Sequence, residues 1–300
     1  MKYRALQLIK PSGMNGPNLA FQELHNHTVN DDRFHWMDKW EEPEEGVLPW
    51  YWRRGQYGRI LKEIKEKKEF VVGPFVIFSS AYKPQRGDEI EILNYTGFKA
   101  IAHHGSWYCQ YARQYYKQKH GHFVMLGTPV SSDVWETGID LPKDKDIMIY
   151  IKKEWRLGEI PELLMKRLPD AEVVEYSHHT RKSLVESARR HKVCIYLAHF
   201  DNNPTAVKEI MAAGCAVISH DIGCPLIIDG VNGYNVSLWA DDPGPMQWKM
   251  IGPDKAANAL ANAAVGSTFN PDIVIDTLKK MTDISQLVKW ILISTGVEHD

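Results

Sequence analysis

The most informative part of the sequence is FDNNPTAVKEIMAAGCAVISHDIGCPLIIDGVNGYNV, residues 200–236. Asn203 is a natural N-cap, Pro204 suits a first helical position, and Gly214 is placed to end the helix. The apolar stripe between them consists of Val207, Ile210 and Met211. Short apolar runs flank this helix on both sides, KVCIYLA (192–198) and CAVISH (215–220). The stretch therefore predicts a strand–helix–strand unit.

The same alternation continues outward in both directions. Further strands are predicted at 3–9, 99–102, 122–126, 146–152 and 171–176, and further helices at 57–68, 160–168, 180–191 and 254–264. Such alternation is typical of parallel sheets with crossover helices. Two segments break the pattern: a tryptophan-rich stretch predicted to be irregular (30–56) and one long final helix (276–293).

The length of 300 residues suits two domains. We predict an N-terminal, acceptor-side Rossmann-like domain at 1–135 and a C-terminal donor-binding domain at 136–275. Residues 276–300 are predicted to carry a C-terminal helix that packs back on the N-terminal domain.

The loop Asp201-Asn202-Asn203 is predicted at the carboxyl end of a strand, where doubly wound domains bind ligands. The helix that follows directs its first N–H groups and the positive end of its dipole toward the ligand. This arrangement predicts an anion site suited to a diphosphate. Glu209 lies off the apolar stripe, and the sequence leaves open whether it faces the ligand or plain solvent.

This region resembles the donor-binding domain of GT-B glycosyltransferases, especially the retaining group called family 4. That group carries an acidic residue, seven intervening residues and a glutamate, then a small-residue helix end, a strand and a "DGxNG" turn. The matching residues here are Asp201, Glu209, MAAG, AVISHDIG and DGVNG, with Asp201 where the family usually has glutamate. The resemblance covers residues 146–236. It implies an α/β GT-B fold, in which two facing Rossmann-like doubly wound domains leave a cleft between them.

The resemblance also implies a function. The chain would move a sugar from a UDP- or GDP-sugar to a hydroxyl acceptor, such as a glycan or a lipid, with retained configuration and no metal or other cofactor. Asp201 would be the catalytic position at the donor sugar, and Glu209 would hold the ribose. The remaining donor contacts would come from Gly13, Gly16, Lys152, Lys153, Arg156, Asn202, Asn203, Pro204 and Thr205. The alternative for these residues is purely structural, as helix caps, turns and exposed charges.

Candidate acceptor residues lie in the N-terminal half. Trp36 and Trp40 have aromatic faces that stack on sugar rings, and acidic side chains surround them. His103 and His104 sit between a predicted strand and a predicted helix. The alternatives are that the tryptophans pack in the core and that the histidines cap the helix. None of the thirteen histidines has the spacing of a metal ligand set.

Bulk properties narrow the class of protein. The formal net charge of −2 provides no general attraction to nucleic acid, so we expect none as a partner. The four cysteines form no CxxC pair and are typical of the reduced thiols of a cytoplasmic protein. No apolar run is long enough for a signal peptide or a membrane span. Three alternative functions stay open: a nucleotide-sugar-binding protein without transferase activity, a nucleotide-sugar epimerase, and a DNA-base glucosyltransferase, against which the charge counts.

Overall fold

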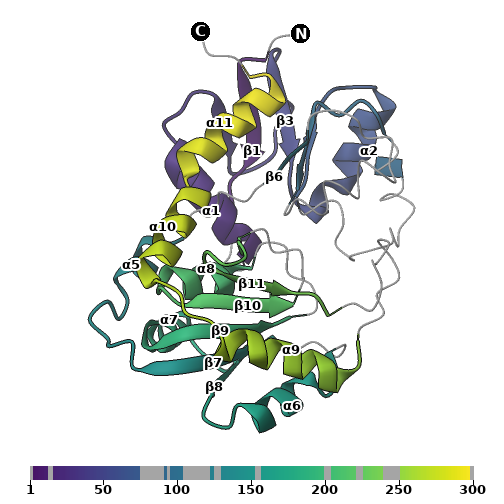
Figure 1. Ribbon diagram of the computed structural model, residues 1–300. Coiled ribbons are helices and arrows are strands. Elements are labelled where there is room, and N and C mark those ends of the chain that lie inside the picture. Colours follow the sequence, from purple (N-terminus) through teal and green to yellow (C-terminus); the bar gives the residue numbers. More distant parts are fainter. Residues whose placement is uncertain are drawn as a thin grey trace. The chain divides into compact units, whose positions relative to one another are not determined.

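The computed structural model describes residues 3–12, 16–74, 91–92, 95–103, 122–124, 130–152, 157–198, 204–220, 226–238 and 251–297. The chain divides into two compact units. Unit 1 contains Met1–Pro129 together with Thr282–Asp300, and unit 2 contains Val130–Met281. Each unit is an α/β structure built on one sheet (Figure 1).

Unit 1 contains a six-stranded sheet in the order β2-β1-β3-β4-β5-β6, and all its strand pairs are parallel. The strands are β1 (Ala5–Ile9), β2 (Phe34–Met37), β3 (Val47–Tyr51), β4 (Val71–Val72), β5 (Ala100–His103) and β6 (His122–Val124). The helices described in this unit are α1 (Gly16–Thr28), α2 (Tyr57–Lys65) and α11 (Ile284–Thr295), and a short 3₁₀ helix, η1 (Arg54–Gln56), precedes α2.

Helices cover both faces of the unit 1 sheet. On one face, α1 and α11 pack against alternate strand residues, among them Leu6, Leu48 and Trp50. On the other face, α2 packs against Tyr51, Val72 and Ile101. Because side chains alternate along a strand, one apolar strand supplies both cores, which explains why β3 is buried along its whole length.

Unit 2 contains a five-stranded sheet in the order β11-β10-β9-β7-β8, again parallel in every pair. Its strands are β7 (Lys145–Ile151), β8 (Glu172–Glu175), β9 (His191–Leu197), β10 (Ala216–His220) and β11 (Gly233–Val236). Its described helices are α5 (Ser132–Glu136), α6 (Ile160–Arg167), α7 (Arg181–Arg190), α8 (Thr205–Ala212), α9 (Pro253–Val265) and α10 (Pro271–Met281).

The two faces of this sheet are also covered. Helices α5, α7, α8 and α10 share one core with Tyr150 and Tyr196, whose rings stack at 5.2 Å. Helices α6 and α9 share the other core with Ile149 and Ile195. Strand residues of odd and even number therefore face opposite layers, as in a doubly wound domain.

The prediction of an irregular segment at 30–56 is wrong, because β2 and β3 lie within it. Trp50 and Trp52 are fully buried, and the Trp52 ring stacks on Phe21 at a centroid distance of 4.0 Å. The acidic residues between the two strands obscured these short apolar runs in the sequence.

The single helix predicted at 276–293 is also wrong, since two helices occupy this region. Helix α10 ends at Met281, and Asp283 caps α11 by accepting a hydrogen bond from the backbone N–H of Ser285 at 2.9 Å. The break coincides with the point where the chain passes from unit 2 to unit 1, so the predicted segment 276–300 contributes to both units.

Candidate functional site

The topology of unit 2 marks one place for a ligand. Strand β8 lies on one side of β7, and the strand that follows it in the chain, β9, lies on the other side of β7. In doubly wound sheets such a change of direction opens a crevice at the carboxyl ends of the two strands. Lys152 follows β7 at this edge, and its backbone N–H donates to the Leu197 carbonyl of β9 at 2.9 Å. The Lys152 ammonium lies 5.7 Å from the centre of the Tyr176 ring, which follows β8.

Helix α8 begins just beyond the carboxyl end of β9. The structure places Pro204 at the N-cap position and Thr205 first in the helix, one residue later than predicted. Proline has no side-chain oxygen, so this cap supplies no acceptor to the first N–H groups of the helix. The positive end of the α8 dipole therefore makes the start of this helix suited to an anion.

Glu209 is buried in α8, with 7% of its surface exposed. Its Oε1 atom lies 2.9 Å from Nε of Arg181, the first residue of α7. Another Arg181 nitrogen, Nη1, lies 3.8 Å from an oxygen of Asp133 in α5. The sequence left open whether the Glu209 side chain faces solvent. Within the described residues of unit 2 it does not. The carboxylate instead joins two helices on one face of the sheet.

Burial and two neighbouring charges shift the pKa of the Glu209 carboxyl. Burial raises the pKa of the Glu209 carboxyl, Arg181 lowers it and nearby Asp133 raises it, and the net shift is upward. Arg181 is thus the group that favours the ionised form. A carboxylate held in this way can accept hydrogen bonds from hydroxyl groups of a ligand.

The DGVNG turn is a structural element of unit 2. Asn232 is fully buried, its amide donates to the Leu226 carbonyl at 2.9 Å, and its side-chain oxygen accepts from the Ile228 N–H at 2.7 Å. A Cβ atom on Gly233 would lie only 1.9 Å from the Val217 carbonyl oxygen of β10. The glycine is therefore required for β11 to pair with β10.

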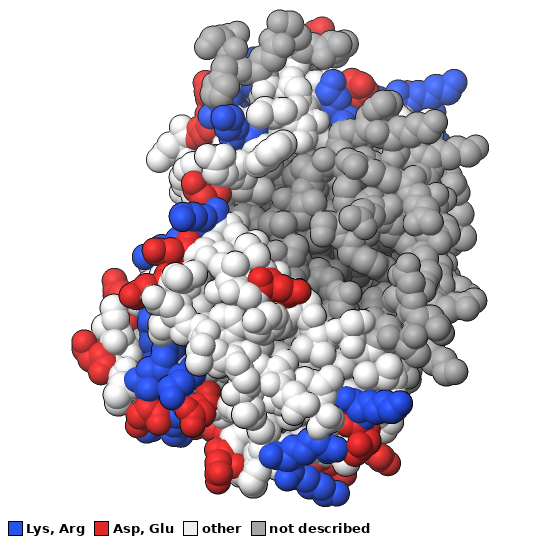
Figure 2. All heavy atoms as spheres, in the orientation of Figure 1, with Lys and Arg blue, Asp and Glu red and all other residues white. Residues whose placement is uncertain are grey.

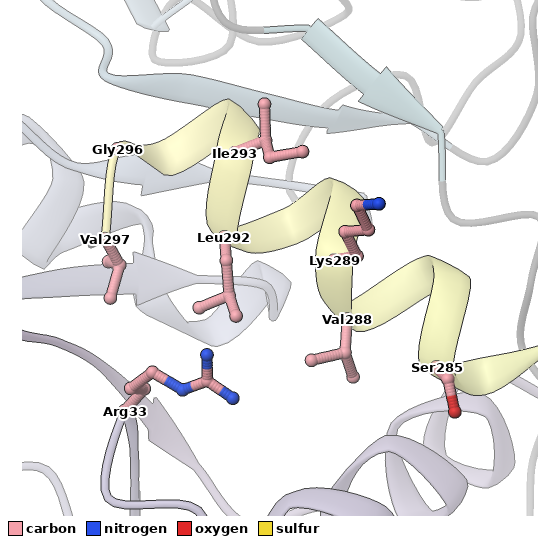
Figure 3. Close-up of a pocket in the computed structure, with 8 residues that line it drawn as sticks. All are labelled: Arg33, Ser285, Val288, Lys289, Leu292, Ile293, Gly296 and Val297. Atoms are coloured by element: carbon pink, nitrogen blue, oxygen red, sulfur yellow. The ribbon is translucent and has the colours of Figure 1, made fainter. Parts of the chain in front are cut away.

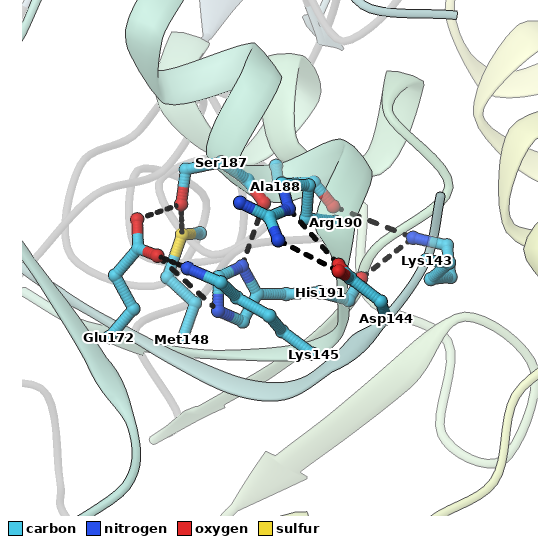
Figure 4. Close-up of polar contacts among 9 residues, drawn as sticks. All are labelled: Lys143, Asp144, Lys145, Met148, Glu172, Ser187, Ala188, Arg190 and His191. Atoms are coloured by element: carbon cyan, nitrogen blue, oxygen red, sulfur yellow. Dashed lines mark hydrogen bonds and ion pairs between the residues drawn. The ribbon is translucent and has the colours of Figure 1, made fainter. Parts of the chain in front are cut away.

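A dense polar cluster lies at the opposite, amino end of the same sheet (Figure 4). Glu172 begins β8 and accepts from Lys145, which begins β7, and from the Ser187 hydroxyl at 2.6 Å. Burial raises the pKa of the Glu172 carboxyl, but the bonds from Lys145 and Ser187 outweigh it and give a net lowering. His191 donates to the Ser187 carbonyl at 2.7 Å, and burial lowers its pKa. This cluster lies at the edge away from the ligand crevice, so we assign it to stability.

A pocket of about 530 Å³ occurs in unit 1 (Figure 3). Its lining consists of Arg33, Ser285, Val288, Lys289, Leu292, Ile293, Gly296 and Val297. Arg33 precedes β2, and Val297 bridges to Tyr3, which precedes β1. The pocket is therefore at the amino edge of the unit 1 sheet, where doubly wound domains do not bind substrates.

The predicted acceptor residues lie in unit 1. Trp36 is on β2, is partly buried, and donates from Nε1 to the Thr28 hydroxyl at 2.9 Å. Trp40 lies 4.7 Å from the Tyr51 ring and packs against the core around α2. His103 is the last residue of β5. Packing accounts for the contacts of both tryptophans in the described residues.

Several predicted site residues are outside the described residues: Gly13, His104, Lys153, Arg156, Asp201, Asn202 and Asn203. Gly16 begins α1. Among the others, Lys152, Pro204, Thr205 and Glu209 belong to unit 2, on β7 and α8 or directly beside them. Sequence reasoning missed Arg181. A signal was present, because a cation at a helix N-terminus opposes the dipole and indicates a nearby carboxylate.

The charged side chains of the described surface are mixed in sign. On the face in Figure 2, the coloured Lys and Arg side chains lie among Asp and Glu rather than in one basic field. Among the described residues, no three His, Cys, Asp or Glu side chains are grouped to hold a metal ion. No described helix has the length and apolar character required to span a bilayer.

Comparison with known proteins gives a fold. No protein-family model matches the chain, and no curated protein matches it. Among solved structures it is similar to sucrose-phosphate synthase from Thermosynechococcus elongatus, with a TM-score of 0.58 and 14% identity over 98% of this chain and 96% of that one. It is similar to the lipopolysaccharide outer core galactosyltransferase WaaB, with a TM-score of 0.55 and 11% identity over 96% and 99% of the two chains. The pneumococcal O-GlcNAc transferase GtfA has a TM-score of 0.53 and 11% identity over 93% of this chain and 60% of that one. The predicted GT-B fold is confirmed.

Proposed function

We propose that the chain is a glycosyltransferase that moves a sugar from a nucleotide-diphosphate donor to a hydroxyl acceptor. The observation that carries this proposal is the grouping in unit 2. The start of α8 and Lys152 follow the adjacent strands β9 and β7, and the buried Glu209 lies in the second turn of α8. The α8 N-terminus and Lys152 suit a diphosphate, and the Glu209 carboxylate suits the hydroxyls of a ribose.

In the reaction, the bond between the anomeric carbon and the donor phosphate oxygen breaks, and a bond to the acceptor oxygen forms. The acceptor hydroxyl releases its proton to solvent, and the nucleoside diphosphate leaves with the added negative charge. Lys152, Lys153 and Arg156 would stabilise that charge together with the N–H groups at the start of α8. Asp201 would contact the transferred sugar, and the backbone near Gly13 and Gly16 would approach the phosphates.

Two similar structures agree with a nucleotide-sugar donor. GtfA was solved in complex with UDP and GlcNAc, and TarM from S. aureus in complex with UDP and α-GlcNAc-glycerol. We extend this donor class to the present chain and propose a UDP- or GDP-sugar, transferred with retained configuration. The acceptor would lie on unit 1, toward Trp36, Trp40, His103 and His104.

A thermal-shift screen of nucleotide sugars tests the donor. A donor present at a hundred times its dissociation constant should stabilise the folded chain by about 2.7 kcal/mol. The matching free sugar serves as the control and should give no shift. If no nucleotide sugar shifts the melting temperature, the proposal is wrong. If a donor binds but no sugar is transferred or released to water, the chain is a binding protein.

Activity should not depend on a divalent metal. The cations at the crevice and the α8 N-terminus supply the positive charge for which other transferases use a metal. We expect turnover in excess EDTA to equal turnover in buffer alone. Loss of activity in EDTA, with recovery on adding magnesium or manganese, would contradict this expectation.

A further inference from the structure

The unit 1 sheet has its own crevice, at the carboxyl ends of β1 and β3. Strand β1 pairs with β2 on one side and with β3 on the other, so the chain direction changes there. Lys10 directly follows β1, and Trp52 and Arg53 directly follow β3.

Arg53 is fixed firmly at this edge. Its Nη2 atom donates to the Lys10 carbonyl at 2.5 Å, and its guanidinium carbon lies 4.4 Å from the centre of the Trp52 ring. Trp52 is 1% exposed and donates from Nε1 to the Ile9 carbonyl at 3.0 Å. Burial lowers the pKa of the Arg53 guanidinium. The Nε atom of Arg53 is buried and has no hydrogen-bond partner in the described structure.

Gln56, three residues later, has the same property. It is 5% exposed, and its Oε1 atom accepts from the backbone N–H groups of Trp52 at 3.0 Å and Arg53 at 2.9 Å. This oxygen therefore fixes the turn after β3. Its Nε2 atom is buried, and no described group accepts from it.

Two orphan donors in one short turn require an explanation. A buried donor left unsatisfied costs about 1–3 kcal/mol, and few such groups occur in native proteins. Both orphans are N–H groups and one belongs to a cation, so the missing partner is an acceptor with negative charge. The planar guanidinium fits the oxygens of a phosphate group particularly well.

We propose that Arg53 and Gln56 form a phosphate-binding subsite at the carboxyl edge of the unit 1 sheet. This subsite is additional to the donor crevice of unit 2. The phosphate belongs either to the diphosphate of the donor or to a second, phosphorylated substrate. Both sources present the same tetrahedral oxyanion.

Calorimetric titration of the full chain distinguishes these sources. If the subsite holds the donor diphosphate, Arg53→Gln should weaken UDP binding by about ten- to a hundredfold and leave uridine binding unchanged. If it holds a second substrate, UDP binding should be unchanged, while the affinity for inorganic phosphate in the presence of saturating UDP should fall by a similar factor. Arg4→Gln, which alters an arginine paired with Glu44 at the surface, is the matched control.

Gln56→Glu is a second variant that preserves the turn. It retains an oxygen to accept from Trp52 and Arg53 but replaces the orphan N–H₂ with another oxygen. The melting temperature shows whether this variant is folded, and in the folded variant we expect at least the same loss of phosphate affinity. The proposal is overturned if either folded variant binds both UDP and phosphate as tightly as the unaltered chain. If the chain binds no nucleotide at all, the same titration with inorganic phosphate in the absence of UDP tests the subsite.

Discussion

Glu209→Gln should weaken binding of the nucleotide-sugar donor by about ten- to a hundredfold. The substitution retains the size of the side chain and removes its negative charge. A hydrogen bond to a charged acceptor contributes about 1.5–3 kcal/mol, and 1.4 kcal/mol corresponds to a factor of ten. Steady-state kinetics should show the effect in kcat/KM for the donor. Glu162→Gln, on the exposed surface of α6, is the control and should leave the donor kinetics unchanged.

Substitution of Arg181, the ion-pair partner of Glu209, provides a second test through the pH dependence of donor binding. Arg181 lowers a carboxyl pKa that burial raises, so Arg181→Gln should raise that pKa further. Donor affinity should then be lost at a higher pH as the solution is acidified, and Arg181→Lys should partly restore the original profile. A nucleotide sugar is the suitable probe, because its diphosphate is esterified at both ends and lacks the second phosphate ionisation, which has a pKa of about 6. An identical pH profile in the two Arg181 variants and the unaltered chain would refute the role of Glu209 as an ionised acceptor.

Gly233→Ala should destabilise unit 2 by about 3 kcal/mol. The added Cβ would lie 1.9 Å from a backbone oxygen of β10, which cannot move without disturbing the sheet. Overpacking of this kind typically costs about 1–3 kcal/mol, and a contact with backbone lies at the upper end. Urea unfolding followed by circular dichroism measures the change.

Gly58→Ala is the natural counterpart of this substitution. Gly58 lies in α2, and a Cβ atom there would meet nothing within 4 Å. Because alanine favours a helix over glycine by about 1 kcal/mol, this change should stabilise unit 1 slightly. Equal effects of the two substitutions would show that the close approach at Gly233 is not what fixes the glycine.

The sequence was most informative where local periodicity and tertiary structure agree. The strands and helices between 146 and 236 were predicted within a few residues, since buried parallel strands appear as apolar runs and Gly214 ends α8 in a left-handed conformation at φ +71°. The region around β2 and β3 was not predicted, because each strand is short and lies among charged residues. The break between α10 and α11 was missed because both helices are apolar enough to appear continuous.

The candidate site was only partly predictable for a related reason. The position of Lys152 and of the α8 start follows from where strands end, which the sequence indicates directly. The pairing of Glu209 with Arg181 joins residues 28 positions apart on different helices, and no local spacing specifies it. The helical pattern correctly excluded Glu209 from the apolar stripe, but an ion pair rather than water covers it.

The placement of α11 has a consequence for the order in which the chain folds during synthesis. Unit 1 begins at the N-terminus, yet one face of its sheet is closed by a helix that follows the whole of unit 2. Unit 2 is contiguous and ends at Met281, so the chain has made every element of its core before α11 is made. The apolar surface of unit 1 that packs against Leu287, Ile291 and Leu292 stays uncovered until α11 leaves the ribosome. Nascent chains released before α11 should therefore recruit chaperones through unit 1, although that unit emerges first.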